Sequence, residues 1–132
     1  MLKKTEAQIQ ASFFQEINLY PKVRPYIFAI PNGGYRRQKS YISKDGKQKS
    51  WSPEAKKLKQ QGVTPGVPDV FLSLPNKLFH GLYIEFKAGK NKPTIEQYDM
   101  IDNLRKAGYR CEVCYSEQEA MDIVMEYLND QP

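Results

Sequence analysis

Residues 66–88, with the sequence GVPDVFLSLPNKLFHGLYIEFKA, contain two apolar runs separated by turn-forming residues. Runs of this length, rich in Val, Ile, Leu and Phe and bounded by Pro and Gly, are typical of β-strands. We therefore predict strands over residues 67–74 and 82–88, joined by the loop 75–81. The loop is short enough for the two strands to pair in antiparallel fashion.

The pairing of these strands decides which polar side chains meet. If Leu74 lies opposite Leu82, then Asp69 faces Lys87, and Glu85 is the diagonal neighbour of Asp69. Diagonal neighbours lie about 7–8 Å apart at the backbone. Glu85 and Lys87 share one face because alternate residues of a strand do, and the apolar residues between them face the core. Three ionisable groups are thus predicted on one face of an apolar hairpin.

Two carboxylates in one place repel each other, and a divalent cation relieves the repulsion. Oxygen ligands favour Mg²⁺ or Mn²⁺ over zinc. Such an ion can bind a phosphate oxygen and activate water, and a neighbouring lysine can stabilise the charge that develops on the phosphate. The alternative is a simple cross-strand ion pair of Asp69 and Lys87, with Glu85 in solvent. The spacing alone leaves both open.

The rest of the chain alternates helices and strands. Helices are predicted at 5–20, 53–61, 94–107 and 116–128, and further strands at 26–30 and 109–115. The helix starts carry N-capping patterns: Thr5–Gln8, Ser52–Glu54, Thr94–Gln97 and Ser116–Glu119. This order predicts one α/β domain over residues 1–132, with a mixed sheet flanked by helices.

The first helix has an unusual acidic residue. Its apolar stripe comprises Ile9, Phe13, Ile17 and Tyr20, and Glu6 falls in the middle of that stripe at 100° per residue. An acidic residue in the first turn is favourable by itself. A carboxylate aimed into a site explains the position equally well.

The positive charge is confined to one stretch. The chain carries a net charge of +5, yet residues 36–59 alone hold nine basic and two acidic residues, a charge of +7. Localised positive charge interleaved with Tyr35, Tyr41 and Trp51 favours contact with a polyanion such as nucleic acid. The stretch belongs to a basic insert of about residues 35–62, in which residues 44–47 are predicted to form a turn between two extended pieces. The basic residues are Arg36, Arg37, Lys39, Lys44, Lys47, Lys49, Lys56, Lys57 and Lys59.

Other classes of site are disfavoured. The sequence has no apolar run long enough for a membrane span and no signal-peptide pattern, so we expect a cytoplasmic protein. One histidine and two cysteines cannot form an ordinary structural zinc site. Cys111 and Cys114 would face opposite sides of a strand and are expected to be reduced and partly buried. His80 is expected to be solvated in the loop.

Pro68-Asp69 followed by Glu85-Phe86-Lys87 resembles the signature of the PD-(D/E)XK nucleases, and the order of elements resembles their αβββαβ core. The chain is more narrowly similar to a stand-alone VRR-NUC domain. This resemblance rests on three further motifs, TEAQI at residues 5–9, PNGG at 31–34 and KLKQQG at 57–62 before PGVPD, and on the helix start at Thr94. It extends over about residues 5–116.

The resemblance implies a role for each matching residue. Asp69 and Glu85 would bind the metal, with the Phe86 carbonyl as a third ligand, and Lys87 would be the catalytic lysine. Glu6 would complete the metal site, Glu16 being a weaker alternative. Gln97 would sit beside the site and contact water or phosphate. Gly33 and Gly34 join the nine basic residues as expected contacts to DNA.

The implied activity is Mg²⁺- or Mn²⁺-dependent hydrolysis of phosphodiester bonds in DNA. We expect a structure-specific endonuclease acting on branched DNA such as four-way (Holliday) junctions in DNA repair, as a homodimer and without an organic cofactor. A flap or nicking nuclease, or the nuclease subunit of a repair or restriction assembly, is the first alternative. A DNA-binding module without activity is the second.

Overall fold

The structure is a computed structural model that describes residues 3–31, 39–42, 48–51 and 53–132. Its centre is a four-stranded sheet in the order β1-β4-β5-β6. Strands β1 and β4 and strands β4 and β5 pair in antiparallel fashion, whereas β5 and β6 are parallel. The sheet is therefore mixed, as predicted. The strands span β1 Ile27–Ala29, β4 Val70–Leu72, β5 Leu82–Phe86 and β6 Arg110–Cys114.

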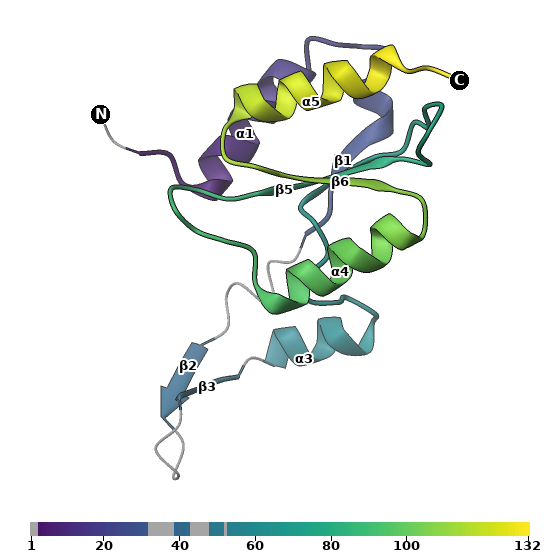
Figure 1. Cartoon of the computed structure of the whole chain (residues 1–132). Coiled ribbons are helices and arrows are strands. Elements are labelled where there is room, and N and C mark those ends of the chain that lie inside the picture. The colour runs from purple at the N-terminus through teal and green to yellow at the C-terminus, as the bar shows by residue number, and fades with distance from the viewer. Residues whose placement is uncertain (1–2, 32–38, 43–47, 52) are drawn as a thin grey trace.

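Helices cover both faces of the sheet (Figure 1). Helix α1 (Glu6–Ile17) packs against α5 (Glu117–Asn129) on one face, and α4 (Ile95–Lys106) lies along β6 on the other. Beyond α4 lie α3 (Pro53–Gln60) and a separate hairpin of β2 (Lys39–Ile42) and β3 (Gln48–Trp51). The hairpin agrees with the two extended pieces expected in the basic insert. No helix of the described residues is long and apolar enough to cross a membrane.

The N-capping patterns form as the sequence indicates. Thr5 and Gln8 make a reciprocal capping box at the start of α1, and Thr94 and Gln97 make a second one at the start of α4. The Ser116 side chain accepts the N–H of Glu119. These bonds satisfy backbone N–H groups that have no partner within the helix. The expected cap at Ser52 lies outside the described residues.

The core lies between the sheet and the α1–α5 layer. On β5, Leu82, Ile84 and Phe86 are fully buried and pack toward Phe13 of α1 and Val124 of α5. The alternating residues of β5 consequently point to the face that carries α4. This confirms the predicted division of the strand into an apolar face and a polar face.

The predicted register between β4 and β5 was wrong by two residues. Leu82 pairs with Leu72, not with Leu74. Leu74 leaves the sheet because its carbonyl accepts the Tyr127 hydroxyl of α5 at 2.7 Å. A shift of two residues exchanges the partners across the strands but keeps every side chain on its face.

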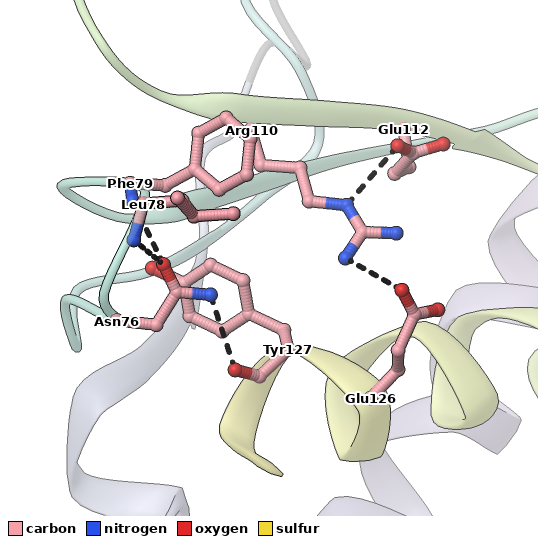
Figure 2. Close-up of polar contacts among 7 residues, drawn as sticks. All are labelled: Asn76, Leu78, Phe79, Arg110, Glu112, Glu126 and Tyr127. Atoms are coloured by element: carbon pink, nitrogen blue, oxygen red, sulfur yellow. Dashed lines mark hydrogen bonds and ion pairs between the residues drawn. The ribbon is translucent and has the colours of Figure 1, made fainter. Parts of the chain in front are cut away.

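The loop after Leu74 is organised by one buried amide (Figure 2). Asn76 accepts the backbone N–H groups of Leu78 and Phe79 and donates to the Tyr127 carbonyl. Beside it, Arg110 of β6 binds both Glu112 and Glu126. The loop is thus fixed to the end of α5 and is longer than the predicted hairpin connection.

Most elements are shorter than predicted. Helix α1 ends at Ile17, and Tyr20 is 41% exposed, so it does not extend the apolar stripe as expected. Turn hydrogen bonds take over after Ile17 and lead the chain into the three-residue 3-10 helix η1 (Arg24–Tyr26) before β1. Strands β1, β4, β5 and β6 are also shorter than predicted, although single ladder bonds continue beyond their ends, from the Ile30 N–H to the Asp69 carbonyl and from the Lys87 N–H to the Cys114 carbonyl.

Candidate active site

A pair of buried carboxylates lies where β4 and β5 come together. Extending the observed register by one residue places Asp69 directly opposite Glu85, a position that the sequence analysis had given to Lys87. Asp69 is 3% exposed and Glu85 is 1% exposed. Burial of two adjacent acids costs free energy unless a cation or hydrogen bonds stabilise them. The pair is therefore unlike an ordinary surface ion pair.

The residue before Asp69 explains how the pair is held. Pro68 lies opposite Phe86 in the register, at a position where the backbone groups of β5 point toward β4. Pro68 has no N–H to donate to the Phe86 carbonyl, so the ladder bond cannot form there. The Phe86 N–H donates to Asp69 Oδ2 at 2.8 Å. Because the N–H and C=O of one strand residue point to the same side, the Phe86 carbonyl is directed toward β4 as well.

Lys87 adds a buried cation at the end of β5. It is 7% exposed, and its backbone N–H continues the sheet by donating to the Cys114 carbonyl. The Lys87 ammonium lies 3.9 Å from Glu6 Oε1, at the first residue of α1. Glu6 thus points to the candidate site, as the second interpretation of its position requires, while Glu16 lies near the other end of the helix.

Gln97 connects α4 to the carboxylates. Its Nε2 donates to Glu85 Oε1 at 3.1 Å, and its Oε1 accepts the Thr94 N–H of the capping box at 2.9 Å. The structure therefore brings Gln97 into contact with Glu85, and its expected contact with water or phosphate stays a prediction. The capping pattern in the sequence indicates the bond between Thr94 and Gln97 but carries no signal for the bond to Glu85.

The donor set fits an oxygen-seeking divalent cation. Two buried carboxylates face each other, a backbone carbonyl is directed to the same place, and neither histidine nor thiolate is among them. Among the described residues, no three acidic, histidine or cysteine side chains are close enough together to hold a metal ion by themselves. Asp69, Glu85 and the Phe86 carbonyl would hold an ion only with further oxygen ligands, such as water or substrate, which suits Mg²⁺ or Mn²⁺.

The approach to Asp69 is held close to α4 by a glycine. Gly66 has a φ of +90°, and a Cβ atom there would lie 2.4 Å from the Glu96 carbonyl oxygen. Only glycine combines this backbone conformation with so close a contact. The segment before Pro68 is therefore fixed against the first turn of α4, next to Gln97.

The predicted DNA contacts are only partly described. Lys56, Lys57 and Lys59 are exposed on α3. Lys39 and Lys49 lie on the paired strands β2 and β3, whose backbone alone is described. Gly33, Gly34, Arg36, Arg37, Lys44 and Lys47 lie outside the described residues.

The remaining chemical candidates do not join the site. Cys111 and Cys114 are free thiols, and burial raises the pKa of Cys111 to about 11 and that of Cys114 to about 12. Such thiols are protonated and unreactive at neutral pH. His80 is exposed, packs edge-on against Tyr109 and lies over Gly108 at the far end of β5.

Comparison with known proteins agrees with this geometry. The VRR-NUC domain family matches residues 4–118. A solved structure described as a VRR_NUC domain protein superposes with a TM-score of 0.76 at 24% sequence identity, covering 99% of this chain and 93% of that chain, which shows a shared fold. A search among curated proteins finds no match. Because the family match extends over most of the chain, the protein belongs to the VRR-NUC family of nuclease-type domains.

Proposed function

We propose that the protein is a Mg²⁺- or Mn²⁺-dependent endonuclease that hydrolyses phosphodiester bonds in DNA. The observation that carries this proposal is the buried pair of Asp69 and Glu85, with Lys87 beside it at the end of the same strand. A domain that only binds nucleic acid has no use for two buried acids, because carboxylates repel phosphate. A nuclease uses the two acids to hold the cation that neutralises the phosphate.

Each residue has a specific task in this proposal. Asp69, Glu85 and the Phe86 carbonyl would hold the ion, which when bound supplies charge neutralisation and an activated water. Lys87 stabilises the negative charge that grows on the phosphate oxygens during attack. Glu6 orients Lys87 through their 3.9 Å contact. Gln97 holds Glu85 in place.

The preferred substrate is proposed to be branched DNA, cut by a homodimer. The described residues of one chain contain one buried carboxylate pair, so paired cuts on two strands require two chains, and a twofold dimer supplies them. The basic residues from Arg36 to Lys59 are proposed to contact the DNA backbone, since they hold the positive excess of the chain. Size-exclusion chromatography with light scattering tests the dimer.

A cleavage panel tests the activity. Duplex, flap, splayed and four-way DNA are incubated with Mg²⁺, Mn²⁺ or EDTA, using the wild type, Asp69→Asn and Glu85→Gln. The matched control is Asp102→Asn, which makes the same chemical change on the exposed face of α4. We expect metal-dependent cutting by the wild type and the control only. Binding without cutting by the wild type, with either metal, would instead indicate an inactive DNA-binding module.

A further inference from the structure

A hollow of about 600 Å³ lies beside the candidate active site. Its walls are two segments distant in sequence, residues 3–7 at the start of α1 and residues 88–91 in the loop after β5. Figure 1 shows the start of α1 next to the loop that leaves β5. Glu6 belongs to this lining and also contacts Lys87. The hollow therefore opens next to the buried lysine.

The lining is rich in lysine. Lys3, Lys4 and Lys90 line it, against one carboxylate, Glu6, which is turned toward Lys87. Lys4 is fixed by Glu117 at 2.7 Å and by the Ser12 hydroxyl at 3.2 Å, so part of its charge is already matched. Lys3 and Lys90 are exposed, and neither has an ion-pair partner among the residues that the structure describes.

The floor next to Lys90 leaves room for a ligand. Gly89 has a φ of +58°, and a Cβ atom built there would have no neighbouring atom within 4 Å. A ligand can thus approach the backbone of this loop closely. Ala88 and Ala7, which also line the hollow, add little bulk. A concave surface with two uncommitted ammonium groups and an accessible backbone suits a phosphate group.

We propose that this hollow binds a backbone phosphate of the nucleic-acid strand, next to the phosphodiester placed at Asp69 and Glu85, with Lys3 and Lys90 as its cationic contacts. The proposal rests on the function proposed above and names a binding surface outside the basic insert. The sequence alone does not indicate this surface, because the chain outside residues 36–59 is slightly acidic in total and Lys3 and Lys90 lie 87 positions apart.

The position of the hollow, next to the site proposed for the phosphodiester, favours a nucleic-acid strand as its ligand. Lys87 connects the hollow to the carboxylate pair, so a strand whose phosphate reaches Lys87 places a neighbouring phosphate within reach of the hollow. Lys3 and Lys90 then position the strand and take no part in the chemistry. Their loss should weaken binding and raise KM while kcat at saturating substrate stays close to that of the wild type.

Affinity measurements at several salt concentrations test the proposal. All proteins carry Asp69→Asn to prevent cleavage, and binding of fluorescent duplex DNA is followed by anisotropy in EDTA. The test variant is Lys3→Gln/Lys90→Gln. The control is Lys22→Gln/Lys77→Gln, which removes two exposed lysines near the opposite ends of α1 and α5. Thermal unfolding of each variant verifies that the fold is kept.

The slope of log affinity against log salt gives the result. Each phosphate contact contributes about −0.9 for duplex DNA, so the test variant should flatten the slope by about 1.8 and the control should leave it unchanged. An unchanged slope in the test variant, or equal flattening in both variants, would overturn the proposal. Because affinity is measured without cleavage, this outcome is independent of whether Asp69 serves catalysis, which the cleavage panel decides.

Discussion

Removal of one charge from the carboxylate pair should stabilise the metal-free protein. In Asp69→Asn the side chain keeps an oxygen that can accept the Phe86 N–H, now bound at 2.8 Å, but loses its charge. The variant therefore tests electrostatic repulsion from Glu85 with little change in shape. Most substitutions of a buried polar residue destabilise a protein, so the expected sign is unusual.

The expected change in unfolding free energy follows from the register between β4 and β5. Side chains directly opposite on neighbouring strands lie about 5 Å apart, and two like charges at that distance repel by about 3 kcal/mol at an effective dielectric constant of 20. Neutralising the acceptor of the Phe86 hydrogen bond returns about 2 kcal/mol, the upper end of the difference between a charge-assisted and a neutral hydrogen bond. The net gain in unfolding free energy is about 1 kcal/mol, or about 3–5 °C in Tm for a domain of this size.

Thermal unfolding in EDTA and in Mn²⁺ provides the assay. Asp69→Asn should melt above the wild type in EDTA, whereas saturating Mn²⁺ should raise the Tm of the wild type and of the control Asp102→Asn but not that of Asp69→Asn. The control Asp102→Asn breaks the exposed contact with Lys106 and should lower Tm slightly in both buffers. If Asp69→Asn melts below the wild type in EDTA, the two acids do not repel and the site has been assigned incorrectly.

Three further predictions address other parts of the site. Lys87→Met should reduce kcat strongly and leave DNA affinity in Ca²⁺ nearly unchanged, because the ammonium acts on developing charge; equal losses of rate and affinity would mark it as an ordinary phosphate contact. Gly66→Ala should destabilise the protein more than Gly62→Ala in chemical denaturation, since both have φ near +90° but only at Gly66 would the added Cβ lie 2.4 Å from the Glu96 carbonyl oxygen; equal effects would exclude the steric explanation. The thiols should resist labelling at pH 8: with a pKa of about 11 in the fold against 9.0 for a free thiol, Cys111 carries about a hundredfold less thiolate. The same pKa shift should lower the free energy of unfolding only above pH 9, where the thiols of the unfolded chain lose their protons before those of the folded protein. Labelling of the native protein as fast as in denaturant would contradict the burial of the thiols.

The sequence could predict which side chains share a face of a strand, but not which residues of β4 and β5 lie opposite each other. Alternation of apolar and polar residues assigns Glu85 and Lys87 to one face, and any shift by two residues preserves that assignment. The register depends on where the ladder ends, and that is decided by Tyr127, 53 residues after Leu74. A local pattern carries no information about such a distant hydrogen bond. The prediction therefore placed Lys87 where Glu85 lies.

Helix starts were predicted more accurately, because their signals are local. Thr5, Thr94 and Ser116 each cap a helix through residues only three positions away. The end of α1 was predicted less well, since Tyr20 continues the helical spacing but becomes exposed in the turn that leads to β1. Proximity of Glu6 to Lys87 follows from α1 packing on the sheet, which no single segment of sequence specifies.

The Gln97 side chain makes two hydrogen bonds, and this affects the thermal stability of the candidate site. One amide closes the first turn of α4 and also holds Glu85, so the helix end and the carboxylate are released together. Helix ends open locally at a lower free-energy cost than the core strands. Warming should therefore loosen this turn while the four-stranded sheet is still intact. The upper temperature at which the site keeps its shape is then set by the fraying of a single helical turn, below the temperature at which the domain unfolds.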